Sequence, residues 1–262
     1  MVGQESIIKK FESQINNKIL PRTLLFLGEQ GSGKHTLANI LANNLLHISV
    51  EDITEDLSLD KLDEIQLCPI QKLYILDSNK IDIKKQNSLL KFFEEPLQNS
   101  YIVLLAESRL TLLPTILNRC QIYSMNSYNS NQLKEITGVT DDLVLHYCRT
   151  PGKILDFMQI DINVYLNYID RMLMLLSRAS WANILRLSEN MYFNDKEKSD
   201  NKFSAQLIFS LLKDRATDLY KNKNIPFIEF QKVNEFVNNL RIPNINKKQL
   251  FENFIFSLKG VL

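Results

Sequence analysis

Residues 23–36 read TLLFLGEQGSGKHT, and this stretch decides the fold of the chain. Residues 23–27 form a short, continuous apolar run, which is typical of a strand buried in a parallel sheet, and Gly28 ends it. The glycine-rich segment up to Lys34 leads into a helical pattern at residues 36–46. A strand, a glycine-rich turn and a helix in this order predict a phosphate-binding P-loop. The alternative is a glycine-rich turn that binds no ligand.

The chemistry of phosphate binding accounts for these residue types. Glycines let the backbone curl so that its N–H groups converge, and the N-terminus of the helix favours negative charge. A lysine at the end of the loop then reaches the outer phosphates. We therefore expect phosphate contacts from Gly28, Gly31, Gly33 and Lys34.

The residue after Lys34 departs from the usual P-loop. A Ser or Thr hydroxyl normally binds magnesium there, but this chain has His35. Thr36 comes one position later, and one residue on a helix is about 100° of rotation, so Thr36 does not simply replace the missing hydroxyl. We keep both residues among the cofactor-binding candidates, but we expect no metal ligand at His35, because no His or Cys lies at ligand spacing. Metal-assisted hydrolysis is expected to be weakened.

A second apolar run, at residues 73–76, ends in Asp77. An acidic residue after such a strand orients magnesium in many P-loop proteins, so Asp77 joins the cofactor-binding candidates. Hydrolytic members with this layout often continue with a Glu that polarises the attacking water, but the residue here is Ser78, which is no carboxylate base. The other interpretation of Asp77 is a helix cap.

Further apolar runs at residues 101–106 and 121–123, with a weaker one at 65–67, alternate with helical patterns at 84–94 and 112–118. An opening helix precedes them and ends near Asn17. This alternation predicts an α/β fold with a mainly parallel sheet covered on both faces. The segment Glu51 to Glu64 carries seven carboxylates against Lys61 alone, and we interpret it as a solvated connection.

Strand-like runs end after Met125, where we place a domain boundary. We expect a P-loop domain at residues 1–125, a small helical unit at 126–160 and a set of longer helices at 161–262, including 164–179, 203–221 and 227–240.

The net charge, the apolar stretches and the cysteines argue against several classes of protein. The net charge is +1 over 262 residues, so the overall balance does not indicate binding to nucleic acid or to an anionic membrane. No stretch approaches the roughly 20 apolar residues of a membrane helix, and the N-terminus lacks the apolar core of a signal peptide, so we expect a cytoplasmic protein without a membrane partner. Cys68, Cys120 and Cys148 form neither a CxxC pair nor an even disulfide set, and we expect no zinc.

Several stretches together resemble one family, the AAA+ clamp loaders of bacterial replication, and within it the delta-prime subunits of the DNA polymerase III holoenzyme. Besides the P-loop, they are Val2-Gly3-Gln4, Leu20-Pro21, QNSLLKFFEEP at residues 86–96 and LLPTILNRC at residues 112–120. These cover about the first 125 residues, and residues 150–155 (TPGKIL) look like the lid segment of the family. The resemblance implies a RecA-like AAA+ P-loop domain, a helical lid and an all-α C-terminal collar domain.

The resemblance also implies a role for Arg119. The family carries an arginine finger in a Ser-Arg-Cys motif, here Asn118-Arg119-Cys120, which reaches into the ATP site of a neighbouring subunit. A guanidinium beside the γ-phosphate stabilises transition-state charge without requiring chemistry in its own subunit. The competing interpretation is an arginine that pairs with a local carboxylate.

Three departures distinguish this chain from a motor subunit of the family. His35 and Ser78 replace hydrolytic groups, and Gly152 stands where motor subunits carry a nucleotide-sensing Arg, although Lys153 is adjacent. The four-cysteine zinc module that often follows the P-loop helix in the family is absent. ATP or ADP is the candidate cofactor, the sequence leaves open whether it is bound and whether magnesium takes part, and we expect little hydrolysis by the chain alone.

The hypothesis from the sequence is therefore a delta-prime-like clamp-loader subunit. Its implied partners are the motor subunits, the delta subunit, the sliding clamp and, through the assembled heteropentamer, primed DNA. Two alternatives remain: an active motor-type AAA+ ATPase with an unusual metal shell around His35, and a P-loop kinase or other phosphotransferase. The long helical tail and the LLPTILNRC segment have no evident purpose in a phosphotransferase.

Overall fold

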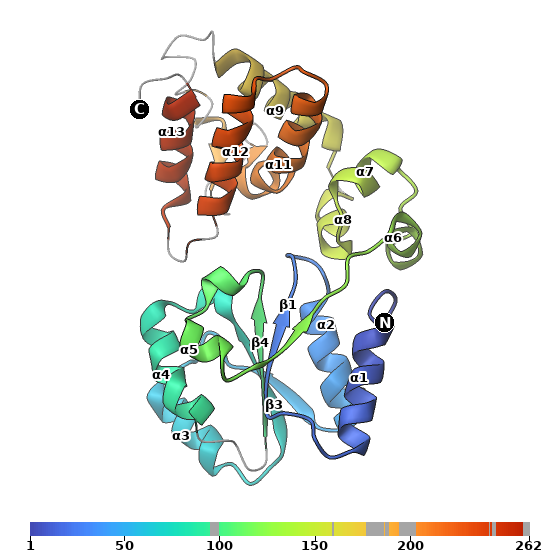
Figure 1. The fold of residues 1–262 in the computed structure, drawn as a ribbon, viewed down its shortest axis with the longest axis vertical. Coiled ribbons are helices and arrows are strands. Elements are labelled where there is room, and N and C mark those ends of the chain that lie inside the picture. Colours follow the sequence, from blue (N-terminus) through green and yellow to red (C-terminus); the bar gives the residue numbers. More distant parts are fainter. Residues whose placement is uncertain are drawn as a thin grey trace. The chain divides into compact units, whose positions relative to one another are not determined.

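The computed structural model describes residues 1–94, 100–158, 160–176, 186, 189–193, 203–240, 242 and 245–258. The chain divides into two compact units (Figure 1). Unit 1 contains Met1–Thr140 and Arg149–Leu155, and unit 2 contains Asp141–Cys148 and Asp156–Leu262. The chain therefore passes from one unit to the other three times. The threefold division at residues 125 and 160 stays a prediction.

The core of unit 1 is a sheet of five parallel strands in the order β2-β3-β4-β1-β5. The strands are β1 (Thr23–Leu27), β2 (Ser49–Asp52), β3 (Lys72–Asp77), β4 (Tyr101–Ala106) and β5 (Gln121–Ser124). Because all strands run the same way, the residues that follow them meet at one edge of the sheet. The predicted parallel α/β sheet is confirmed.

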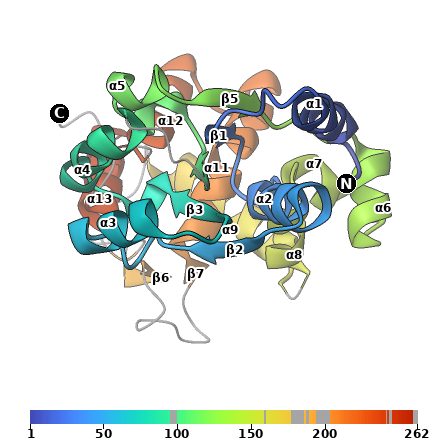
Figure 2. The same ribbon diagram turned by 90° about the horizontal axis from the view of Figure 1, so that it is seen from below.

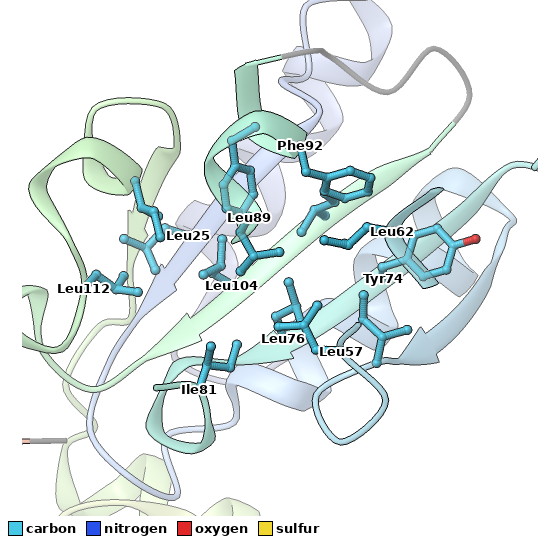
Figure 3. Close-up of a cluster of buried hydrophobic side chains, with 14 of the residues drawn as sticks. Leu25, Leu57, Leu62, Tyr74, Leu76, Ile81, Leu89, Phe92, Leu104 and Leu112 are labelled. Carbon is cyan, nitrogen blue, oxygen red and sulfur yellow. The ribbon is translucent and has the colours of Figure 1, made fainter. Parts of the chain in front are cut away.

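Successive residues of the inner strands alternate between two apolar cores, one on each face of the sheet. One face is covered by α1 (Glu5–Asn16) and by α2 (Lys34–Asn39), which continues as the π-helix η1 (Ile40–Leu46). The other face is covered by α3 (Leu59–Leu67), α4 (Ile83–Glu94) and α5 (Pro114–Leu117) (Figures 2 and 3). Burial on both faces explains why the inner strands are continuous apolar runs.

The sequence prediction was wrong for the acidic segment and for the weak strand at residues 65–67. The fifth strand is β2, which starts at Ser49 and includes Glu51. Residues 65–67 belong to α3, whose first turn is capped by the Ser58 hydroxyl accepting from the Lys61 N–H at 3.2 Å. Leu62 and Ile65 are buried on one side of this helix, so its apolar spacing is helical.

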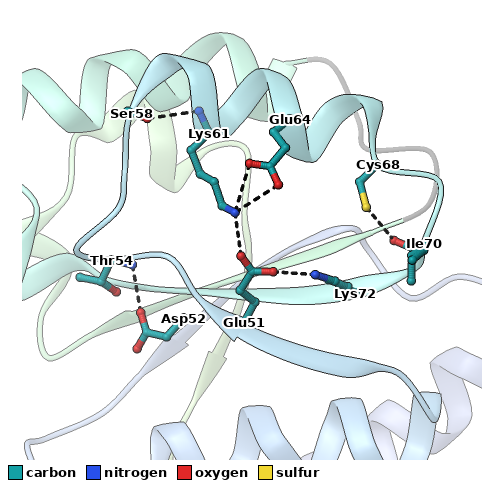
Figure 4. A network of polar contacts seen from close by, with 9 residues as sticks. All are labelled: Glu51, Asp52, Thr54, Ser58, Lys61, Glu64, Cys68, Ile70 and Lys72. Atoms are coloured by element: carbon teal, nitrogen blue, oxygen red, sulfur yellow. Dashed lines mark hydrogen bonds and ion pairs between the residues drawn. The ribbon is translucent and has the colours of Figure 1, made fainter.

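Charge pairing makes a strand possible in the acidic segment (Figure 4). The carboxylate of Glu51, on edge strand β2, lies 2.8 Å from Lys61 Nζ of α3 and 2.8 Å from Lys72 Nζ of β3. Hydrogen bonds from Lys61 and then Lys72 lower the pKa of Glu51. Lys61 and Lys72 therefore neutralise the charge of Glu51. From the composition alone, this carboxylate was expected to be solvated.

The helical parts beyond residue 125 are α6 (Ser130–Thr137), α7 (Asp142–Tyr147), α8 (Pro151–Phe157), α9 (Ile162–Leu176), α11 (Ala205–Lys221), α12 (Phe227–Asn239) and α13 (Lys247–Leu258). The predicted helices at 203–221 and 227–240 match α11 and α12 closely, and residues 177–179 of the predicted helix at 164–179 lie outside the described part. Strands β6 (Met191–Tyr192) and β7 (Phe203–Ser204) form a short parallel pair that the sequence did not indicate.

Unit 2 is held by an aromatic core and one polar network. Rings from α11, α12 and α13 pack together, with centroid distances of 4.5–6.3 Å among Phe209, Phe236, Phe251 and Phe254. Arg215 of α11 binds both carboxylate oxygens of Asp170 on α9, at 2.5 and 2.6 Å, and also donates to Tyr147 Oη of α7. This bond assigns α7 to the helical unit. Among the described residues, no helix has the length and apolar character needed to cross a membrane.

The Glu51 network predicts a specific acid dependence of stability. The stability from a carboxylate with a lowered pKa is complete above the ordinary value of 4.5 and decreases as pH falls below it. We expect Glu51→Gln to lower the urea midpoint at pH 7 and to reduce the loss of stability as the pH falls from about 5 to about 2. The same change at Glu55, which pairs with Lys80 on the surface, is the control. Identical pH profiles for wild type and Glu51→Gln would contradict this account.

Candidate functional site

The glycine-rich loop at residues 28–33 connects β1 to α2 and begins beside β4. The Gly28 N–H donates to the Ala106 carbonyl at 3.0 Å, which fixes the start of the loop. Gly31 and Gly33 have φ angles of +76° and +89°, and Gly33 is the N-cap of α2. Positive φ favours glycine, because other residues are strained there. Alternating left-handed and right-handed residues form the backbone concavities that bind anions.

Five consecutive carbonyl groups of this loop accept hydrogen bonds from the chain itself. Lys34 Nζ donates to those of residues 28 and 29, at 2.6 and 2.9 Å. Thr150 Oγ1 donates to residue 30 at 2.8 Å, the Gly152 N–H to residue 31 at 3.0 Å, and Tyr128 Oη to residue 32 at 2.8 Å. The carbonyl side of the loop is thus bound by protein donors, which fixes its conformation.

The segment at residues 150–153 contacts the loop through two glycines, Gly31 and Gly152. A Cβ added to Gly152 would lie 2.5 Å from Gly31 Cα, and a Cβ added to Gly31 would lie 2.8 Å from Lys153 N. Only glycine permits this backbone approach at either position. The sequence singled out Gly152 as a missing arginine, whereas the structure gives it a packing role. Lys153 Nζ lies 3.8 Å from the Glu29 carboxylate, so its charge also faces the loop.

Lys34 is 9% exposed. Burial lowers its pKa, while the negative charges of Glu107, Asp77 and Glu29 oppose this shift. The buried hydroxyl of Ser32 has no hydrogen-bond partner among the described residues. A buried cation and an unsatisfied hydroxyl on one glycine-rich loop fit a phosphate group, which accepts hydrogen bonds from both.

The other candidates around the loop are placed as follows. His35 and Thr36 are exposed at the start of α2. Asp77 Oδ1 accepts from the Asn79 N–H at 3.0 Å and caps a short 3-10 helix, which is the cap interpretation that the sequence left open. Ser78 is buried, and its hydroxyl lies 3.4 Å from that of Thr111. Among the described residues, no group of three or more His, Cys, Asp or Glu has metal-site geometry.

Glu107 is a site residue that the sequence reasoning missed. It follows Ala106, the last residue of β4, and its Oε1 accepts from Asn79 Nδ2 at 3.2 Å. Among the carboxylates that raise the pKa of Lys34, Glu107 contributes most. Its position directly after the apolar run at residues 101–106 was the available signal, because parallel strands end at the same edge of the sheet.

Arg119 lies at the other edge of the sheet. Its carbonyl accepts from Thr23 Oγ1 at 2.8 Å, and Thr23 is the first residue of β1, whereas the phosphate loop follows the last residue of that strand, Leu27. Four strand residues separate the two ends by about 13 Å. Arg119 Nη1 donates to the Thr115 carbonyl at 2.9 Å, one turn back in α5. The structure therefore does not bring Arg119 and Lys34 into one site.

The QNSLLKFFEEP motif contributes to the placement of the segment before Arg119. Gln86 of α4 is buried, and its amide donates to the Thr111 carbonyl at 2.9 Å and accepts from the Leu113 N–H at 3.0 Å. These two bonds fix the backbone just before Pro114 starts α5. Cys120 is largely buried, and burial raises the pKa of its thiol to about 12, so the thiol stays neutral. Glu95 and Pro96 of the motif lie outside the described residues.

Residues 46–129 match the family model described as DNA polymerase III, delta subunit. Three curated relatives are similar. They are the tau subunit of Bacillus subtilis DNA polymerase III (26% identical, 51% of this chain and 30% of the relative), the delta' subunit of the same organism (26%, 45% and 46%), and the delta' subunit of Haemophilus influenzae (37%, 22% and 17%). The chain spans less than half the length of these relatives. These matches support a member of the clamp-loader family.

Solved structures resemble nearly the whole chain, and one of them serves as an example. A variant of RuvB from Thermotoga maritima matches with a TM-score of 0.53 and 16% identity, covering 99% of this chain and 88% of that chain. At this identity the likeness shows the fold alone. It agrees with a P-loop sheet followed by a helical region, as the sequence predicted.

The contact between Gly31 and Gly152 predicts the effect of a single methyl group. Gly152→Ala places a Cβ against the backbone of Gly31, and we expect the free energy of unfolding to fall by about 1–3 kcal/mol. Leu155→Ala, at an exposed position of the same helix, is the control and should change it little. Urea denaturation followed by circular dichroism measures both. Equal stability of Gly152→Ala and wild type would refute the close contact.

Proposed function

We propose that this chain is a delta-prime-like subunit of a DNA polymerase III clamp loader and that Arg119 acts on the nucleotide of a neighbouring subunit. The observation that carries the proposal is the position of Arg119 at the sheet edge opposite its own phosphate loop. An arginine beside the first residue of β1 does not serve the ligand of Lys34, because the phosphate loop begins about 13 Å away at the other end of that strand. Arg119 also lies within residues 46–129, which match the delta subunit family model.

The guanidinium is suited to this role by its chemistry and by its support. It keeps its charge at any physiological pH and presents several donors in a plane, which suits the oxygens of a transferring phosphoryl group. Thr23 holds the Arg119 backbone, and Gln86 holds the segment that leads into α5. A charged group on a backbone fixed by hydrogen bonds stabilises transition-state charge with little reorganisation.

The chain's own loop would hold the phosphates of ATP or ADP. Backbone amides of residues 29–31 and 33–34, the Ser32 hydroxyl and Lys34 would be the binding groups, and bound magnesium would supply charge neutralisation. His35 in place of the usual hydroxyl and Ser78 in place of the usual carboxylate leave the chain without two groups that support hydrolysis. We therefore assign binding rather than turnover to this site.

The remaining parts of the proposal concern assembly. The helices of unit 2 supply a collar through which the chain joins motor subunits and the delta subunit in a heteropentamer. That complex would load the sliding clamp onto primed DNA in the cytoplasm. The names of the curated relatives support the setting of a replication complex.

Substitution of Arg119 tests the central claim. In a loader reconstituted from this chain and its partner subunits, we expect Arg119→Ala to lower DNA-stimulated ATPase and clamp-loading rates by about 100-fold, because one source of transition-state charge is lost. Assembly, measured by gel filtration, should be unchanged. Arg109→Ala, in the nearby 3-10 helix Arg109–Thr111, is the matched control. Full activity of an assembled Arg119→Ala loader would eliminate the proposed role.

The alternative of a motor-type ATPase rests on the phosphate loop, whose donors fit a nucleotide. It is tested on the purified chain alone with magnesium and ATP. We expect no turnover above background, because the hydroxyl and carboxylate groups are replaced at positions 35 and 78. Turnover that Lys34→Ala abolishes would favour the motor assignment instead.

A further inference from the structure

We propose that Glu107 makes the phosphate loop of this chain discriminate against the third phosphate of a nucleotide, so that the site prefers ADP to ATP. The inference rests on the proposed nucleotide binding at residues 28–34, and it concerns the selectivity of that site. It is independent of Arg119, which lies at the opposite edge of the sheet.

The geometry places the Glu107 carboxylate beside the loop. Strands β1 and β4 are adjacent and in register, with Leu27 opposite Ala106, and the Gly28 N–H donates to the Ala106 carbonyl at 3.0 Å. Gly28 and Glu107 are therefore the first residues beyond two neighbouring strand ends. Glu107 projects from the same edge of the sheet as the lysine-bearing loop.

The carboxylate is held in place by a bonded neighbour. Asn79 Nδ2 donates to Glu107 Oε1 at 3.2 Å, and the Asn79 N–H donates to Asp77 Oδ1 at 3.0 Å. Asn79 thus joins the residues that follow β3 and β4. Asp77 and Glu107 therefore lie at the ends of neighbouring strands, and the charges of both act on Lys34.

The charges around Lys34 determine the relative affinities for ADP and ATP. In a P-loop the lysine offsets the charge of the outer phosphates. Here the same ammonium already faces negative charge from Glu107, Asp77 and Glu29, and Glu107 acts on it most strongly. A third phosphate adds negative charge next to this lysine and is repelled by the nearby carboxylate, and the solvent exposure of Glu107 limits this repulsion to a modest size. The absence of a hydroxyl at position 35 removes one magnesium ligand that would offset it.

The test compares ADP and ATP binding to the full-length chain by isothermal titration calorimetry, with EDTA and with magnesium. We expect wild type to bind ADP about tenfold or more tighter than ATP in EDTA, and Glu107→Gln to reduce that ratio by strengthening ATP binding. The glutamine keeps a carbonyl acceptor for Asn79, so the loop next to β4 is preserved. Glu12→Gln, at an exposed position of α1, should leave the ratio unchanged.

Several results would overturn the proposal. An equal ADP-to-ATP ratio in wild type and Glu107→Gln would do so, as would tighter ATP binding by wild type. Loss of magnesium-dependent ATP binding in Glu107→Gln would make Glu107 a metal-binding group and contradict the repulsive role. Binding that survives Lys34→Ala, or the absence of nucleotide binding by both proteins, would remove the site itself. None of these outcomes changes the Arg119 experiment, so a failure here is separable from a failure of the proposed function.

Discussion

The structure of unit 1 depends on the hydrogen bonds that hold the carbonyl groups of residues 28–32. A glycine-rich loop has many accessible conformations, and ordering it costs conformational entropy. Here the cost is offset by donors from Lys34, Tyr128, Thr150 and Gly152. Three of these donors lie about a hundred residues further along the chain than the loop. The conformation of the loop is therefore fixed by the tertiary fold of unit 1.

The parallel sheet places the phosphate loop and Arg119 at opposite ends of its strands. The strands end beside Lys34, Ser32, Asp77 and Glu107. Arg119 lies where strands begin, held by Thr23. A residue at one edge and a loop at the other serve different ligands unless the chain bends between them, and β1 is a rigid, fully paired strand between its neighbours β4 and β5. This separation suits a subunit that has one ligand of its own and contributes to another.

The inner strands were predictable because burial on both faces requires continuous apolar residues, as at 73–76 and 101–106. Strand β2 was not predictable, because a charged residue such as Glu51 is typical of a loop. Its pairing with Lys61 and Lys72 becomes evident only in the structure. The glycines and Lys34 of the phosphate loop were evident from local spacing. Tyr128, Thr150 and Glu107 were not, because their roles depend on which distant elements the fold places next to the loop, and a single sequence contains no such distances.

The contact between Gly31 and Gly152 also restricts the residue that position 152 accepts. In the family that this sequence resembles, motor subunits carry an arginine at the position of Gly152. With the two backbones at hydrogen-bonding distance in this chain, a side chain at position 152 fits only if residues 150–153 move away from the loop. An arginine introduced at position 152 would therefore cost stability, whatever it contributed to nucleotide binding. The two glycines are coupled across the 120 residues that lie between them in the sequence, so the residue allowed at one position depends on the residue at the other.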